Sequence, residues 1–350
     1  MIWTGWVICI VSLVAASFSK TAWQLIVTQG LGYGVGFLIL YYSVLSMLNE
    51  WFVERRGLAY GILFAAAGIS GTGLPFLTDY MLRRLGFANT LRVFAIAMLV
   101  MIGPILPFCR GRLPPTKPKK DSGTILWKPI VKNPIFYFFT ISNLFQGLAF
   151  YLPFFYIVIY AGTLSISSTK AVLLFGILNL SQVVSQIIIG WLSDYANVFL
   201  LLVLSNAGSL IACILWVTAV GFNHLVFFAI LYGLFAGGYS VLVTRFVTAL
   251  TADQPTSLWL YGILAFQRGV GNVASGPLSA LLLKAMQMNN NGDMSMGFRQ
   301  LIYFVGGCLL AASAGGVGFF WRQHALGPAR YDSPLRLERR GSRPSGLSGG

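Results

Sequence analysis

Residues 198–220 read VFLLLVLSNAGSLIACILWVTAV and carry no charged side chain. An α-helix rises about 1.5 Å per residue, so a helix of this length crosses the ~30 Å hydrocarbon core of a bilayer. Apolar runs of similar length fill most of the remaining chain, at about 1–19, 23–48, 58–79, 91–109, 134–160, 169–192, 225–249, 258–283 and 300–321. The pattern predicts an all-α polytopic membrane protein with about 10 transmembrane helices.

The composition of the 350-residue chain agrees with a membrane protein. Hydrophobic residues make up 57% of the chain and charged residues 9%, whereas soluble domains carry about 25% charged residues. The mean hydropathy is +0.76. Too few charged side chains remain to cover a water-soluble globule of this length, so the composition excludes an ordinary soluble enzyme.

Lysine and arginine are concentrated on one side of the predicted membrane. The chain has 24 Lys and Arg and 9 Asp and Glu, which gives a net charge of +15. With the apolar runs taken as spans, 15 basic residues fall on the side of residues 110–133 and 322–350, and 7 fall on the other side. Because basic loops stay in the cytoplasm, we expect both segments to be cytoplasmic in a multi-pass protein of the cell membrane. No basic, aromatic-interleaved soluble module indicates a nucleic-acid partner.

The segment 110–133 divides the chain into two blocks of apolar runs. It is rich in Pro, Lys and Arg, so it is predicted to be a solvated linker between a four-span block at 1–109 and a six-span block at 134–321. Residues 322–350 are basic and rich in Gly, Ser and Pro, a composition typical of disorder. We therefore expect two helical blocks, a linker and a disordered tail.

The two blocks have similar spacing of glycine and proline. Gly34 is followed 41 residues later by Pro75, and Gly233 is followed 44 residues later by Pro277. Glycine lets helices approach closely and proline bends them. In the second block the loop GWLSD, at 190–194, precedes this pair, and its equivalent in the first block would fall before residue 1. We therefore expect a 6+6 architecture of which this chain shows 4+6, without the first two helices.

The GWLSD loop, the basic linker and the paired Gly/Pro helices together resemble the pattern of the major facilitator superfamily. The stretches EWFVERRGLAYGILFAAAG (50–68), NPIFYFFTISNLFQGLAFYLPFFY (133–156) and RGVGNVASGP (268–277) are similar to the fungal branch of its monocarboxylate porter family. The resemblance implies a two-half helix bundle and secondary-active transport by alternating access. It also implies an Asp/Arg pair in the eighth helix, but the equivalent residues 169–192 contain neither Asp nor Arg.

Arg268 lies about ten residues into its apolar run and hence near the middle of the membrane. An arginine at that depth costs at least ~2.5–3.5 kcal/mol, so it requires a cavity or a partner. Asn272, Ser275 and Ser279 follow on the same helix face. Two interpretations stand open. The arginine compensates an anionic substrate in a substrate pathway, or it is a structural residue bonded to carbonyls or to an acid.

Two further polar stripes have helical spacing. Asn179, Gln182 and Gln186 are predicted to line the substrate pathway. Interhelical hydrogen bonds are favoured for Asn143 and Gln146, although each stripe is consistent with either role. Both stripes place amide side chains inside the membrane, where they require hydrogen-bond partners.

Residues at the ends of the spans are predicted to have structural roles. Asp194 and Gly190 of the GWLSD loop are expected to hold a cytoplasmic helix end, as the loop of the family does. Arg55 and Arg56 form a basic pair at the same side of the membrane. Arg245, within about one turn of a span end, is expected to extend its charge to the membrane surface.

No residue pattern supports catalysis. The sequence has no HExxH, no G-x-S-x-G and no P-loop motif. The 4 cysteines are far apart and form no CxxC pair. We therefore predict a protein that is not an enzyme and needs no cofactor or metal. A small molecule and the lipid bilayer are its expected partners, and the sequence does not indicate an oligomeric state.

Three functions are consistent with these observations. The leading hypothesis is a secondary-active transporter of a small, monocarboxylate-like organic acid. The alternative keeps this mechanism and changes the cargo, to export of a fungal secondary metabolite. A hypothesis from a different class is an inactive fragment or a non-transporting membrane scaffold, which the 4+6 arrangement favours.

The distribution of basic residues generates a topological prediction. A reporter enzyme that is active only outside the cytoplasm, fused after Arg322, should give no signal, because the tail is expected to be cytoplasmic. The same reporter placed in the loop at Lys20, on the opposite side, should be active. Strong activity of the fusion after Arg322 would contradict the orientation.

Overall fold

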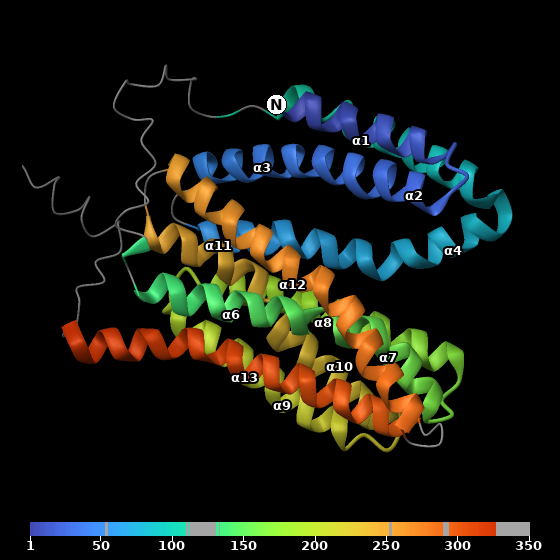
Figure 1. Ribbon diagram of the computed structural model, residues 1–350. Helices are drawn as coiled ribbons and strands as arrows, with labels where there is room; N and C mark the ends of the chain where they lie inside the picture. The colour runs from blue at the N-terminus through green and yellow to red at the C-terminus, as the bar shows by residue number, and fades with distance from the viewer. Residues whose placement is uncertain are drawn as a thin grey trace, which may run out of the picture.

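The computed structural model of the chain is a bundle of helices (Figure 1). It describes residues 1–52, 55–109, 111, 131–132, 134–251, 254–289 and 294–326, so most of the predicted linker and residues 327–350 of the predicted tail lie outside the described residues. The helical elements are α1 (Ile2–Ala16), α2 (Ala22–Leu25), η1 (Ile26–Gly32), α3 (Tyr33–Trp51), α4 (Arg56–Ile102), η2 (Leu106–Phe108), α6 (Pro134–Phe150), α7 (Leu152–Thr163), α8 (Ser168–Leu192), α9 (Val198–Val217), α10 (Phe222–Ala236), α11 (Tyr239–Leu250), α12 (Gln254–Asn289) and α13 (Met294–Leu326). The all-α prediction is confirmed for the described residues.

Each predicted apolar run coincides with helical structure. Within the described residues, six helical stretches are long and apolar enough to cross a membrane, and Ile2–Ala16 and Gly297–Ser313 are shorter apolar helices. α12 is long but is not among the six, because Gln267, Arg268 and Asn272 lower its hydropathy. The last helix, α13, continues to Leu326 and so includes the first residues of the predicted tail.

Several runs are shaped by breaks that the hydropathy pattern does not show. The run 58–79 and most of the run 91–109 lie in the single element α4, where Gly86 has a φ of 75° and a ψ of 172°. Glycine tolerates this positive φ because it has no Cβ. The chain reverses there and returns beside α1 (Figure 1). The runs 134–160 and 225–249 are each divided into two helices, α6 with α7 and α10 with α11.

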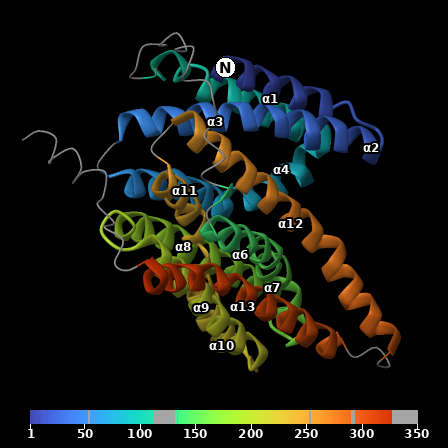
Figure 2. The same ribbon diagram turned by 60° about the vertical axis from the view of Figure 1, so that its left-hand side comes forward.

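The N-terminal helices meet the C-terminal helices where α4 packs along α8 (Figures 1 and 2). Gly57 and Gly61 of α4 face Gly190 of α8. A Cβ atom added to Gly190 would lie 2.6 Å from the carbonyl oxygen of Gly57 and 2.9 Å from the Cα of Gly61. Small residues at helix interfaces in membranes allow such close backbone approach. Glycine on both helices therefore determines how closely the two parts of the bundle pack.

The buried core lies mainly in the C-terminal helices. One large cluster of buried hydrophobic side chains joins α6 through α10 with α13 and includes Trp216 and Phe228. A second cluster joins α3 and α4 to α6, α9, α11 and α12. This second cluster lies at the end of the bundle where α3 ends and α4 begins, called here the linker end. It connects the two parts of the bundle there.

The glycine contact generates a stability prediction. Gly190→Ala should destabilise the folded protein by about 1–3 kcal/mol, because the added methyl group overfills the contact with α4. Gly176→Ala, in the same helix with nothing within 4 Å of the added Cβ, is the matched control and should be neutral or stabilising. Thermal unfolding of the purified protein in detergent measures both. Equal midpoints for the two variants would contradict the role of Gly190.

Candidate functional site

A cavity of about 200 Å³ lies between the two parts of the bundle, roughly midway along α12. Its walls come from α4, from the junction of α6 and α7, and from α11 and α12. The lining residues are Phe64, Tyr151, Ser240, Val243, Tyr261, Leu264, Ala265, Arg268, Gly269 and Asn272. Aromatic and aliphatic side chains make up six of these ten residues, and Arg268 is the one charged residue among the described residues of the lining.

Arg268 is held in place by α6 and α11. Its Nη1 donates a hydrogen bond to the hydroxyl oxygen of Ser240 at 3.0 Å. The guanidinium carbon lies 4.8 Å from the ring centroid of Phe150 and 5.3 Å from that of Tyr239. These cation–π contacts offset part of the cost of a charge inside the membrane. Gly147 allows the close approach of α6, since a Cβ atom there would lie 2.9 Å from the carbonyl oxygen of Arg268.

The positive charge of Arg268 has no acidic partner among the described residues. The ion pairs found in that part of the chain are Arg83 with Asp79 and Arg245 with Asp194. A guanidinium has five N–H donors, and Ser240 accepts from one nitrogen only. Further donors are therefore available to a ligand in the cavity.

The polar stripe that follows Arg268 along α12 divides into two environments. Asn272 lines the cavity, and its side-chain oxygen makes no hydrogen bond with the described residues. Ser275 is fully buried and donates to the carbonyl oxygen of Asn272 at 2.7 Å. Ser279 bonds to the hydroxyl of Tyr156 at 2.9 Å. The structure thus brings Asn272 together with Arg268 and places the two serines in helix packing.

The stripe on α8 lies away from this cavity. Asn179 and Gln186 face α4, where Gly71 and Gly68 leave room for their amides. Gln182 lies against Gly237 near the end of α10. None of the three amides is among the residues that line the Arg268 cavity. Their predicted place in the substrate pathway stays a prediction.

The Asn143 amide on α6 forms hydrogen bonds with α12, as expected if this residue connects helices. Its Nδ2 donates to the carbonyl oxygen of Leu264 at 2.8 Å and to Oε1 of Gln267 at 3.2 Å. Gln267 in turn donates to the carbonyl oxygen of Thr140 at 2.6 Å. Gln146 is buried, and its amide makes no hydrogen bond with the described residues.

A tyrosine contact connects α3 to α12 on the linker side of the cavity. The hydroxyl oxygens of Tyr41 and Tyr261 lie 3.2 Å apart, and the rings of Tyr42 and Tyr261 lie 5.8 Å apart. Sequence analysis missed these residues, because single tyrosines in apolar runs form no pattern and Tyr41 is far from Tyr261 in the chain. The contact lies between the cavity and the linker end.

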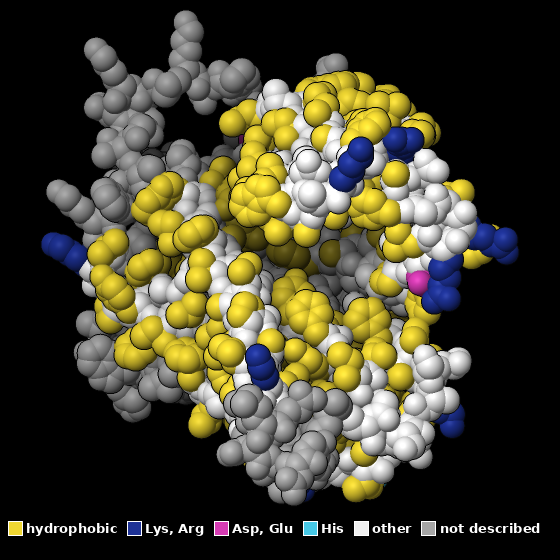
Figure 3. All heavy atoms as spheres, turned by 45° about the vertical axis from the view of Figure 1, so that its right-hand side comes forward, with side chains coloured by type: hydrophobic (Ala, Val, Ile, Leu, Met, Phe, Trp, Pro, Cys, Tyr) yellow, Lys and Arg dark blue, Asp and Glu magenta, His cyan; other side chains and the backbone are white. Residues whose placement is uncertain are grey.

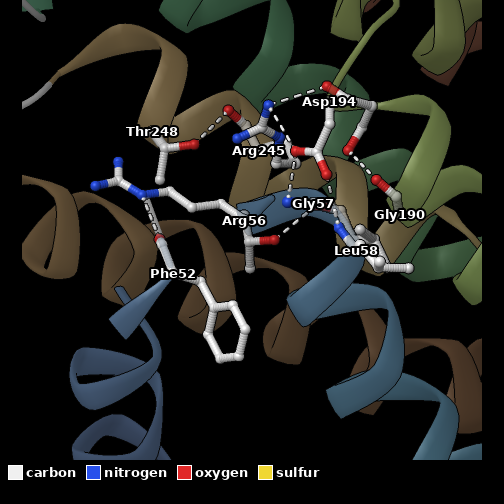
Figure 4. Close-up of polar contacts among 11 residues, drawn as sticks. Phe52, Arg56, Gly57, Leu58, Gly190, Asp194, Arg245 and Thr248 are labelled. Carbon is white, nitrogen blue, oxygen red and sulfur yellow. Dashed lines mark hydrogen bonds and ion pairs between the residues drawn. The ribbon is translucent and has the colours of Figure 1, made fainter. Parts of the chain in front are cut away.

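At the linker end, Asp194 binds the first turn of α4 (Figure 4). Its two carboxylate oxygens accept hydrogen bonds from the backbone amides of Gly57 at 2.8 Å and Leu58 at 3.0 Å. Amides at a helix N-terminus have no partner within the helix and favour a negative charge. The Asp194 side chain is 5% exposed. The GWLSD loop therefore stabilises the start of a helix that belongs to the other part of the bundle.

The arginines near this loop have different environments. The Nη2 atom of Arg245 lies 3.3 Å from Oδ1 of Asp194 and donates to the carbonyl oxygen of Ser193 at 3.0 Å. It is therefore paired with a carboxylate of the GWLSD loop, and its extension to the membrane surface stays a prediction. Arg56 donates through Nε to the carbonyl oxygen of Phe52 at 3.0 Å. Arg55 precedes the first residue of α4.

The end of the bundle away from the linker is more open. Figure 3 shows the surface hollowed between the N-terminal helices and the C-terminal helices. An open groove of about 460 Å³ lies along α4 there, lined by Ser70, Gly71, Leu74, Pro75, Thr78, Asp79 and Leu82. The two parts of the bundle are thus connected at the linker end and separated at the far end.

Comparison with known proteins agrees with the sequence resemblance to the superfamily. A sequence profile described as Major Facilitator Superfamily matches residues 1–220. The chain is 24% identical to MFS transporter asaE of Aspergillus flavus, over 86% of this chain and 66% of the relative. It is 28% identical to Agnestins efflux protein AgnL12 of Paecilomyces divaricatus, over 67% of this chain and 53% of the relative. The chain spans about two-thirds or less of the length of these relatives, and they do not single out the monocarboxylate branch.

Two solved structures share the fold. The proton:xylose symporter XylE matches with a TM-score of 0.65 at 13% identity, covering 92% of this chain and 79% of that one. A bacterial homologue of the iron transporter ferroportin, in an outward-facing state, matches with a TM-score of 0.61 at 14% identity, covering 92% and 83%. The matched relatives and structures are transporters, which agrees with the prediction that the chain is not an enzyme.

The Asp194 contact generates a further prediction. Asp194→Ala should destabilise the protein by about 3–5 kcal/mol, because Arg245 loses its carboxylate while it stays largely buried. Asp194→Asn should cost less, since the amide keeps one acceptor oxygen for the α4 amides. The control is Asp79→Ala, which breaks the exposed pair with Arg83 and should cost no more than about 1 kcal/mol. Thermal unfolding in detergent distinguishes these cases, and similar losses at Asp194 and Asp79 would contradict the assignment.

Proposed function

Because the chain belongs to the Major Facilitator Superfamily, we propose that it forms the substrate cavity of a secondary-active transporter for a small organic acid. The observation that carries this proposal is the cavity around Arg268. It places a guanidinium without a carboxylate partner among the described residues inside the predicted membrane. An anionic substrate supplies the missing negative charge when it binds.

The arrangement of contacts supports alternating access, in which two helical blocks rock around a central site. The Asp194 contact at the linker end and the Tyr41–Tyr261 contact on the linker side of the cavity join the blocks. The far end is hollowed (Figure 3). Transport to the other side requires these linker-end contacts to open. In this proposal the blocks are residues 1–109 and 134–321, and the linker and the tail face the cytoplasm.

Export is the second candidate for the direction and cargo of transport. One matched relative is named as an efflux protein for agnestins. This name favours export of a secondary metabolite over uptake of a monocarboxylate nutrient. The cavity chemistry fits either direction, because an organic acid of either origin presents the same carboxylate to Arg268.

Mutation of Arg268 tests the proposed function. The purified chain in proteoliposomes should exchange external labelled acid, with benzoate and lactate as probes, for internal unlabelled acid. Such exchange needs no ion gradient to drive it. Arg268→Ala should lower the rate of exchange per folded molecule by about 10- to 100-fold, because a charge-assisted hydrogen bond to the carboxylate is lost. Arg268→Lys should be partly active, since lysine keeps the charge but loses the planar two-point contact.

The control for this experiment is Arg84→Ala, which removes an exposed arginine and should leave exchange unchanged. Folded yield is measured for every variant by size-exclusion chromatography. Normal exchange per folded molecule in Arg268→Ala would refute the substrate role of Arg268. Absence of exchange of either acid by the unmodified chain would favour the hypothesis of an inactive fragment or scaffold.

A further inference from the structure

We propose that the Arg268 cavity selects planar aromatic acids over aliphatic acids. This inference rests on the proposed transport of organic acids and names the substrate class of that site. It concerns the walls of the cavity, whereas the proposed function depends on its charge alone.

Aromatic side chains from three separate elements surround the space in front of Arg268. Phe64 comes from α4, Tyr151 from the junction of α6 and α7, and Tyr261 from α12. Aromatic rings interact favourably with other rings in stacked or edge-to-face arrangements, beyond the effect of buried area. A planar ring in the cavity can contact these walls, and an aliphatic chain lacks this additional interaction.

The guanidinium is oriented before any substrate binds. Phe150 and Tyr239 pack on it, and Ser240 holds one of its nitrogens. Such preorganisation lowers the entropy lost on binding. The planar fork of an arginine matches the two oxygens of a carboxylate. The cavity therefore combines a fixed anion site with aromatic walls.

The volume of the cavity favours a compact acid as the substrate. Pockets for drug-sized ligands usually measure about 300–1,000 Å³, and this cavity measures about 200 Å³. A single substituted ring, or two fused rings, is the largest aromatic acid that this space favours.

Asn272 adds a preference for a polar group on the ring. It lies one helical turn, about 6 Å, along α12 from Arg268, and its side-chain oxygen has no hydrogen-bond donor among the described residues. That oxygen is itself buried, so the amide must turn toward the cavity that Asn272 lines before a ring hydroxyl can donate to it. In this inference Arg268 binds the carboxylate, and the reoriented Asn272 amide accepts from a ring hydroxyl.

Equilibrium binding to the purified 350-residue chain in detergent tests this inference. The probes are benzoate, 4-hydroxybenzoate, cyclohexanecarboxylate and neutral benzamide, measured by calorimetry. Benzoate should bind about tenfold more tightly than cyclohexanecarboxylate, and benzamide should bind most weakly of the four probes. 4-Hydroxybenzoate should bind more tightly than benzoate, and Asn272→Ala should remove that advantage.

Variants of the walls separate ring recognition from charge recognition. Phe64→Leu and Tyr151→Leu keep an apolar wall without a ring, so each should reduce the ratio of the benzoate affinity to the cyclohexanecarboxylate affinity. Tyr303→Leu, which removes an exposed ring on α13, is the matched control and should keep the ratio. The thermal unfolding midpoint of each variant shows that it is folded.

Two results would overturn the inference in distinguishable ways. In the first result, benzoate and cyclohexanecarboxylate bind with equal affinity, and Arg268→Ala abolishes binding of both. This result would reject aromatic selectivity and leave the proposed acid transporter intact. Binding of both acids that is unchanged in folded Arg268→Ala would reject the anion site, and the proposed function with it.

Discussion

The close backbone approach of α4 and α8 is the contact on which the arrangement of the two parts depends. Gly57 and Gly61 face Gly190 across it, at separations that a side chain on Gly190 would fill. Lipid tails are as apolar as the helix surfaces, so helices in a membrane associate mainly through such packing and through hydrogen bonds. This approach also brings the GWLSD loop to the first turn of α4, where Asp194 binds the free amides.

Two arginines of the chain show opposite solutions to the cost of burying a charge. Arg245 forms an ion pair with Asp194, whose carboxylate also accepts from the free amides at the start of α4. Arg268 has aromatic rings and a hydroxyl around it and opens on a cavity. The first arrangement is complete within the protein and suits a structural contact. The second is electrostatically incomplete among the described residues, which is the property expected of a site for an anion.

The cavity and the linker-end contacts are mechanically connected through α12. Tyr261 lines the cavity and also contacts Tyr41 of α3. Arg268, two turns further along the same helix, contacts Ser240 of α11. A substrate that displaces Tyr261 therefore acts directly on the contact between α3 and α12. In the proposed mechanism this is where occupancy of the site affects the closure of the linker end.

The sequence by itself determined the all-helical membrane fold and the superfamily, because hydropathy and motifs depend only on the order of residues along the chain. It also predicted that Arg268 lies near the middle of the membrane. Helical spacing also grouped Asn272 with Arg268. It did not separate Ser275 and Ser279 from them, nor did it show that the α8 amides face α4. The Asp194–Arg245 pair and the Tyr41–Tyr261 contact were decided only by tertiary structure. Periodicity defines the faces of one helix, whereas the partner of each face depends on how helices distant in the chain pack together.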